Sequence, residues 1–154
     1  MASKTLKLLL TPLMAASTVG LGLSVAAHLY ACADGCIDNK AVFYTLYLGI
    51  FPLALAAAIF ATSAEEGMSA RAVWRKTWQD CPRWMRIMTY GFAIYTIVNI
   101  AIVVVIVETN PKVTAAIALD VPTPIAWHAY SGHWMAIYSG CLAIFLAAFR
   151  RLQR

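Results

Sequence analysis

The side chains best suited to chemistry in this chain are its three histidines and two of its cysteines. His28, Cys32 and Cys36 are spaced four residues apart, and His128 and His133 lie near the start of the last apolar run. Imidazole nitrogen and thiolate sulfur are the donors that bind haem iron, zinc and copper in proteins. These five residues are therefore the candidates for a cofactor or metal site.

Two of the histidines are suited to be the axial ligands of a b-type haem. His28 lies near the end of the first apolar run, and His133, or alternatively His128, lies at a comparable depth in the last. Facing helices of a bundle can hold haem between two imidazoles, so a haem or quinone site is one prediction. The alternative is an aromatic belt at the membrane interface, where amphipathic rings are favoured without any ligand. That belt would comprise Trp127, Tyr130 and Trp134.

A metal ion is an alternative ligand for the same residues. One continuous helix would place His28, Cys32 and Cys36 on one face, and His133 or His128 could add a further ligand from the last run. Thiolate and imidazole together suit zinc or copper. The Asp34-Gly35 pair is typical of a turn, which would end the helix before Cys36 and weaken this prediction.

A disulfide between Cys32 and Cys36 is the third alternative. Oxidising compartments favour disulfides, and Gly35 permits the turn that would bring the two sulfurs within reach. A four-span chain with a cysteine pair in its first outer loop resembles the DsbB-type quinone-linked thiol oxidases, which implies thiol oxidation. The chain departs from that family, because its spacing is CxxxC instead of CxxC and its second outer loop has no cysteine. A structural disulfide or two idle thiols are therefore expected instead of catalysis.

The composition places these candidates in a membrane protein. Of the 154 residues 62% are hydrophobic and 12% charged, and the mean hydropathy is +0.71. Apolar runs long enough to cross a bilayer as helices extend over about 8–31, 42–62, 87–107 and 127–149. The predicted fold class is all-α: a four-helix transmembrane bundle that forms a single integral membrane domain over 1–154.

The basic residues indicate how the bundle is oriented. Ten of the twelve lysines and arginines flank the spans on one side, whereas Lys40 and Lys112 lie on the other. Cytoplasmic loops are enriched in these residues, so both termini are expected in the cytoplasm and all three histidines near the outer face. The net charge of +5 is thereby explained by topology, and nucleic acid is not an expected partner.

An amphipathic helix is predicted over about 70–81, between the second and third spans. Trp74 and Trp78 are four residues apart and share one face, while Arg71 and Arg75 point elsewhere. A basic helix with tryptophans on its apolar face is typical of a helix that lies on the membrane surface. These four residues are the predicted membrane-surface contacts.

Other features predict how the spans pack and connect. Ala16, Gly20 and Ser24 are four residues apart, a pattern of small residues that lets helix backbones approach closely. Asn99 is the one amide within the third span and is expected to face another helix. In the second outer loop, 112–124, neighbouring prolines disfavour a continuous helix.

Two short motifs resemble a group of small bacterial four-span inner-membrane proteins. They are Cys81-Pro82-Arg83-Trp84-Met85 and the Ser131-Gly132-His133-Trp134-Met135 segment. The resemblance implies a bacterial inner-membrane location and no activity. The predicted function is that of a non-catalytic accessory or structural subunit. Its expected partners are the lipid bilayer and either other membrane subunits or a second copy of the chain.

Overall fold

The computed structural model describes residues 2–33, 35, 40–62, 69–118 and 123–154. The described residues form helices and no strand, and four of the helices are long and apolar enough to cross a membrane. The predicted all-α four-helix bundle is thereby confirmed. The helices are α1 (Ala2–Cys32), α2 (Lys40–Thr62), α3 (Ala70–Asp80), α4 (Arg83–Thr109), α5 (Pro111–Ala118) and α6 (Pro124–Arg151).

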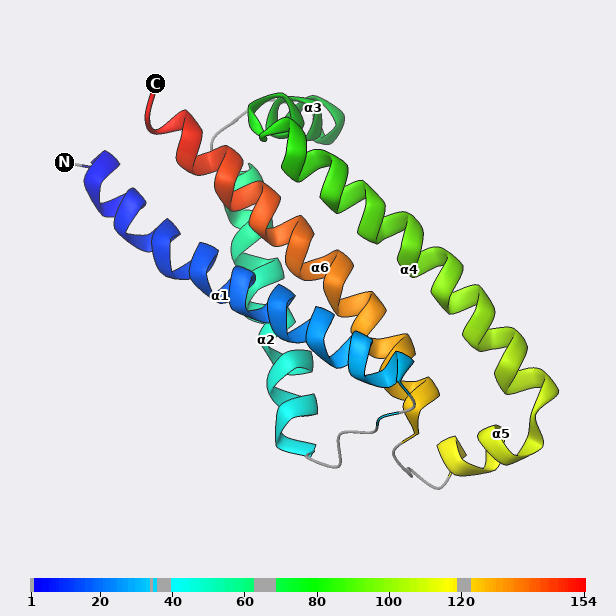
Figure 1. Ribbon diagram of the computed structural model, residues 1–154. Coiled ribbons are helices and arrows are strands. Elements are labelled where there is room, and N and C mark those ends of the chain that lie inside the picture. The colour runs from blue at the N-terminus through cyan, green and yellow to red at the C-terminus, as the bar shows by residue number, and fades with distance from the viewer. Residues whose placement is uncertain (1, 34, 36–39, 63–68, 119–122) are drawn as a thin grey trace.

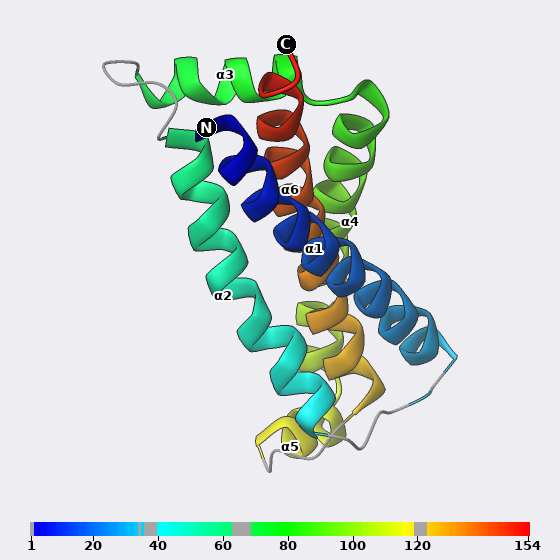
Figure 2. The ribbon, with the colours of Figure 1, turned by 90° about the vertical axis from the view of Figure 1, so that its left-hand side faces the viewer.

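Helix α6 is the centre of the bundle. Figure 1 shows it between α1 and α4, with α2 behind, and the view turned by 90° in Figure 2 shows α1 crossing in front of it, with α2 to the left and α4 to the right. In the most apolar stretch of α6 61% of the residues are buried, against 11% in α4. The other three long helices are therefore held together mainly through α6.

Small residues let α1 pack closely on α6. Ser17 and Ser24 are fully buried seven residues apart, and Gly20 lies between them against the ring of Tyr138. Ala16, in contrast, is exposed. The predicted stripe of small residues therefore begins at Ser17 instead of Ala16. Lipid tails are as apolar as the side chains, so no hydrophobic force drives helices together in a membrane. Close van der Waals contact of this kind makes the association of α1 with α6 favourable.

Helix α4 is attached to α6 by polar side chains that donate to backbone carbonyl oxygens. The bonds run from Thr89 Oγ1 to Ser139 (3.3 Å), from Thr96 Oγ1 to Gly132 (2.7 Å) and from Asn99 Nδ2 to His128 (2.9 Å). Asn99 thus faces another helix, as its place in an apolar run predicts. A hydroxyl or amide in an apolar medium needs a partner, so these three residues fix the rotation of α4.

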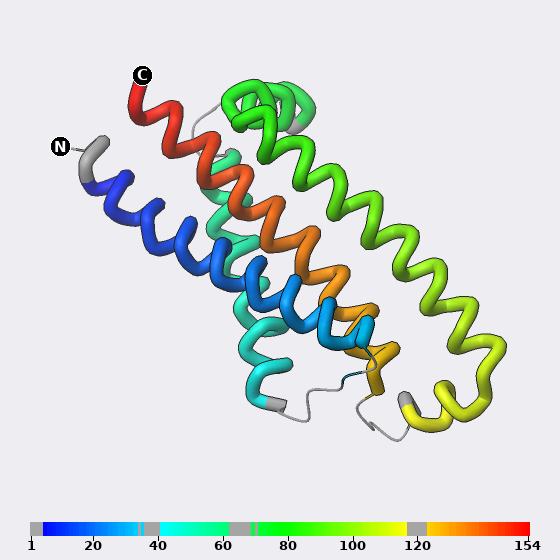
Figure 3. The backbone as a smooth tube through the Cα atoms, in the orientation of Figure 1, coloured from blue at the N-terminus to red at the C-terminus, as the bar shows by residue number. Residues whose placement is uncertain are grey.

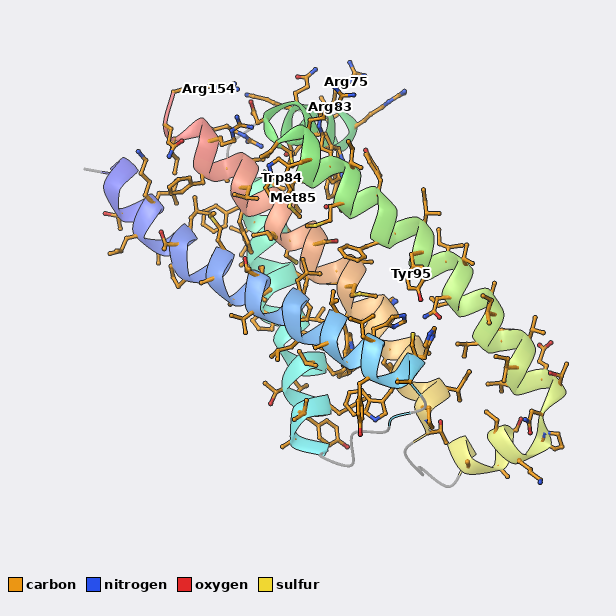
Figure 4. The ribbon with its side chains drawn as sticks, in the orientation of Figure 1. Arg75, Arg83, Trp84, Met85, Tyr95 and Arg154 are labelled. Atoms are coloured by element: carbon orange, nitrogen blue, oxygen red, sulfur yellow. The ribbon has the colours of Figure 1, made fainter. Side chains whose placement is uncertain are left out.

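Helix α3 lies crosswise at the end of the bundle that also holds both termini (Figure 2). Its inner face contacts α6 through Asp80, which forms ion pairs with Arg151 (3.0 Å) and Arg154 (2.9 Å). Trp74 is 47% exposed, and Arg71 and Arg75 are also exposed. Contact of these residues with lipid stays a prediction. Figure 4 shows other arginines at the same end, among them Arg83.

At the opposite end of the bundle α5 follows α4, as the smooth trace in Figure 3 shows. Here a short helix, α5, was not expected. Asn110 Oδ1 accepts hydrogen bonds from the backbone N–H groups of Lys112 and Val113, and Pro111 is the first helical residue. Proline is well suited to that position, because its missing N–H would have no helical partner there. Proline therefore begins a helix here where we expected it to prevent one.

We expect Gly20→Ala to destabilise the bundle by about 1–3 kcal/mol, the usual range for overfilling a packed core. A Cβ at Gly20 would overlap the ring of Tyr138, whereas a Cβ at Gly22 meets no atom within 4 Å. Gly22→Ala is therefore the matched control. Thermal unfolding in detergent, followed by circular dichroism, measures both. Equal midpoints for the two variants would contradict the close packing of α1 on α6.

Candidate functional site

Three of the candidate ligands meet at the end of the bundle opposite the termini. The His28 and His128 rings are in contact, with centroids 4.1 Å apart, and Cys32 Sγ lies 3.2 Å from His128 Nε2. One donor atom from each of the three residues lies within 4.8 Å of the others. His28 is buried, His128 is half-buried and Cys32 is exposed, so the cluster extends from the interior to the surface.

Two helices position this cluster. His28 and Cys32 are four residues apart near the end of α1 and share one face, while His128 lies in the first turns of α6. Ala27 and Ala31, on the same part of α1, are buried. Their small side chains let the two helices come close enough for the rings to touch. Packing of small residues therefore determines where the imidazoles meet.

His28 is held by hydrogen bonds at both ring nitrogens. Its Nδ1 lies 2.9 Å from Ser131 Oγ, and its Nε2 lies 2.5 Å from the hydroxyl of Tyr95 on α4. The Ser131 hydroxyl itself donates to the Trp127 carbonyl oxygen, so we assign the proton to His28 Nδ1, which donates to Ser131. Nε2 is then the acceptor of the Tyr95 hydroxyl proton. This tautomer orients the ring from two different helices.

The donor set fits a transition-metal ion. Ligand atoms around a tetrahedral ion with bonds of about 2.0–2.3 Å are about 3.3–3.6 Å apart. The three donor atoms here lie within 4.8 Å of one another, so closing them around an ion requires movements of about 1 Å. The Nδ1–H bond from His28 to Ser131 is the outer contact that orients metal-binding imidazoles. Coordination through Nε2 would require the Tyr95 hydroxyl to turn away.

One predicted ligand, His133, is not among the described residues that meet. His133 is exposed, and it follows His128 by five residues, which is about 140° around a helix of 3.6 residues per turn. Cys36 lies outside the described residues, so the structure does not describe its bonds. The predicted Cys32–Cys36 disulfide therefore stays a prediction. Of the described residues, His128 of α6 and His28 and Cys32 of α1 are the candidate ligands that meet.

A haem between His28 and His128 has no room in this arrangement. Axial imidazoles approach the iron from opposite faces of a flat macrocycle, whereas these two rings touch each other. The exposed His133 does not face the buried His28 ring. The geometry therefore favours a small ion over haem at this end of the bundle.

The aromatic residues near the site pack inside the bundle more than at its surface. Trp127 and Trp134 are 4% and 0% exposed, and both contact Phe43 of α2 edge to face. Of the three residues of the predicted belt, Tyr130 alone is exposed, by 44%. The two tryptophans are seven residues apart on the buried face of α6, so this difference follows from helix rotation. Trp127 and Trp134 therefore belong to the core, whereas the exposed His133, Tyr30 and Tyr44 are still consistent with a belt, which stays a prediction.

Sequence reasoning missed Tyr95 and Ser131 as partners of His28. Tyr95 is one polar group within a long apolar run, and Ser131 follows His128 by three residues, which is close to one helical turn. That spacing was the available signal for Ser131. For Tyr95 there was none, because its contact with His28 depends on how α1 and α4 both pack on α6.

Comparison with known proteins adds no relative. The chain matches no protein-family model, no curated protein and no solved structure. The resemblance of its two short motifs to bacterial four-span membrane proteins therefore stays a prediction. What the site can do is inferred from the geometry of its own residues.

The other described cysteines differ from Cys32 in accessibility. Cys81, at the end of α3, and Cys141, within α6, are buried, whereas Cys32 is exposed. Burial raises the pKa of the Cys81 thiol, and the nearby positive charges of Arg86 and Arg150 lower it by less. Since the thiolate is the nucleophile, Cys81 is the less reactive group.

In variants that retain one cysteine each, we expect Cys32 to react with N-ethylmaleimide many times faster than Cys81 at neutral pH in the presence of a chelator. Cys81 is shielded, and its raised pKa lowers its thiolate fraction, so its reaction should need a higher pH. Mass spectrometry of timed samples measures both rates, and denaturation in dodecyl sulfate should make them similar. Equal rates in the folded protein would contradict the burial of Cys81.

Proposed function

We propose that the protein is a non-catalytic integral membrane protein that holds a zinc or copper ion at the outer end of its bundle. The observation that carries the proposal is the meeting of His28, Cys32 and His128, with donor atoms within 4.8 Å of one another. The two imidazoles and the thiol are brought together from α1 and α6. They form the donor set that borderline and soft metal ions prefer.

The three candidate ligands among the described residues leave one position of a tetrahedral site to another ligand. A thiolate with two imidazoles suits Zn²⁺, Cu⁺ or Cu²⁺, and a fourth ligand from water or a partner would complete a tetrahedral site. Because Cys32 is exposed, that position faces the surface of the protein. This supports delivery or retention of an ion more than a closed structural site, which uses four protein ligands.

The proposal includes an orientation: both termini in the cytoplasm of a bacterial cell and the metal cluster at the outer face of the inner membrane. Most lysines and arginines belong to the end of the bundle that holds the termini and α3. Cytoplasmic ends of membrane helices are enriched in these residues, which supports the orientation. It is also supported by the even number of candidate spans. The role of accessory subunit in a larger complex is kept as part of this proposal, and native co-purification tests it.

After removal of metal with a chelator and reduction of thiols, the detergent-purified protein is expected to bind about one Zn²⁺ or Cu⁺ per chain. Cys32→Ser and His128→Ala should each weaken binding by more than about 100-fold, because each removes one of three ligands. His133→Ala is the matched control and should bind as the unchanged protein does, because its side chain lies away from the cluster. Metal titration with elemental analysis measures stoichiometry and affinity.

Two outcomes would contradict the metal proposal. One is substoichiometric metal in the unchanged protein under reducing conditions. The other is an equal loss of affinity in His133→Ala and His128→Ala, which would show that the two histidines contribute through stability alone. Thermal unfolding of each apo variant separates a folding defect from a lost ligand.

The orientation predicts which end reacts with a membrane-impermeant maleimide in intact spheroplasts. In a background without native cysteines, Ala115→Cys in α5 should be labelled, and Gln79→Cys in α3 should be labelled only after permeabilisation. Both positions are exposed and lie at opposite ends of the bundle, so they form a matched pair. The reverse pattern would place the metal cluster in the cytoplasm and overturn the proposed orientation.

A further inference from the structure

Three arginines gather where α4 begins and α6 ends. Arg83 and Arg86 are neighbours one turn apart at the start of α4, and Arg150 is in the last turn of α6. Burial raises the pKa of the Cys81 thiol, and the positive charges of Arg86 and Arg150 counter that rise, so both guanidinium groups lie near this residue. Cys81 belongs to the same buried cluster as Ala147 of α6. We call Arg83, Arg86 and Arg150 the basic corner of the bundle.

No described carboxylate neutralises the basic corner. Among the described residues, Asp80 has the one side-chain carboxylate at this end of the bundle, and its two oxygens are paired with Arg151 and Arg154. Arg86 Nε is buried, and it has no hydrogen-bond partner in the part of the chain that the structure describes. Like charges that lie together repel each other, and an anion between them removes the repulsion. The basic corner therefore suits a phosphate, which guanidinium groups bind strongly.

Exposed tryptophans place the basic corner at the level of the lipid head groups. Trp84, in the first turn of α4, is 60% exposed, and Trp74 of α3 is 47% exposed. Figure 4 labels Arg83 and Trp84 at the same end of α4. Tryptophan is favoured at the boundary between head groups and acyl chains. The phosphate of a phospholipid lies at this level of the membrane.

An exposed apolar stripe continues from the basic corner along α4. Ile87, Tyr90 and Ile94 follow Arg83 at helical spacing, and they are 62%, 52% and 64% exposed. From Arg83 to Ile94 the helix rises about 16 Å, which is about half of a hydrocarbon core about 30 Å thick. One acyl chain has this length. A free phosphate ion would contact the arginines alone, whereas a phospholipid contacts both the arginines and the stripe.

We propose that the basic corner and the apolar stripe bind one anionic phospholipid, with its phosphate between Arg86 and Arg150 and an acyl chain along α4. Phosphatidylglycerol has a net negative charge that the zwitterionic phosphatidylcholine lacks, so arginines without a counter-charge select the anionic lipid. The bound lipid would join the beginning of α4 to the end of α6. The proposal goes beyond metal binding and does not depend on it, because the metal cluster lies at the opposite end of the bundle.

The test uses the full chain in a neutral detergent, titrated with phosphatidylglycerol or phosphatidylcholine and followed by native mass spectrometry. We expect about one phosphatidylglycerol per chain, bound about tenfold more tightly than phosphatidylcholine. Arg86→Gln with Arg150→Gln should raise the Kd for phosphatidylglycerol about 25-fold, since each basic residue near an anionic head group contributes about fivefold. Arg71→Gln with Arg75→Gln is the matched control, because it removes the same charge from exposed positions of α3 at the same end. This control should leave the Kd unchanged.

Two further variants separate charge from folding. Arg86→Lys with Arg150→Lys keeps both charges and should retain most of the affinity. Circular dichroism shows whether each variant is folded. If the double glutamine variant is not, the exposed Arg150→Gln alone should raise the Kd about fivefold.

Four results would overturn the phospholipid proposal. The first is equal affinity for the two lipids, and the second is an equal loss of affinity in the double glutamine variant and its α3 control. The third is displacement of phosphatidylglycerol by an equal concentration of glycerol 1-phosphate, which would show that the apolar stripe contributes nothing. The fourth is a dimer that binds no phosphatidylglycerol, which would show that a second copy of the chain covers this face.

Discussion

The close approach of α6 to its neighbours is the constraint on which this structure depends. In lipid, helices associate through van der Waals contact and hydrogen bonds, because the surrounding chains are as apolar as the side chains. Gly20 and the buried serines of α1 provide that contact for one neighbour. For α4, Thr96 and Asn99 provide hydrogen bonds to backbone carbonyl oxygens. The rotation of each helix about its axis follows from these contacts, and so does every side chain that faces a partner.

The sequence is sufficient for much of the fold, because long apolar runs, small residues and a lone amide each have one main physical explanation in a membrane. Four spans and an inward-facing Asn99 follow from them. The beginning of α5 does not, because proline both disrupts and begins helices. The burial of Trp127 and Trp134 also required the structure, since a tryptophan near a span end is equally consistent with a belt or a core.

The candidate site, like the fold, has features that the sequence predicts and features that required the structure. That histidines and a cysteine gather at one end follows from topology, whereas the choice of His128 over His133 does not. The two residues differ by about 140° of helix rotation, and that rotation is fixed by contacts of α6 with three other helices. His28 also joins the three helices at this end, since its Nδ1 bonds to Ser131 of α6 and its Nε2 to the Tyr95 hydroxyl of α4.

The ion pairs of α3 have a consequence for biosynthesis. Asp80 is buried and pairs with Arg154, which follows it by 74 residues. At about 5–20 residues per second, its partner is made about 4–15 seconds later. During that interval α3 has left the ribosome with its carboxylate unpaired, and it has no α6 against which to pack. The inner face of α3, which the finished protein buries against α6, therefore stays uncovered until the last helix is made.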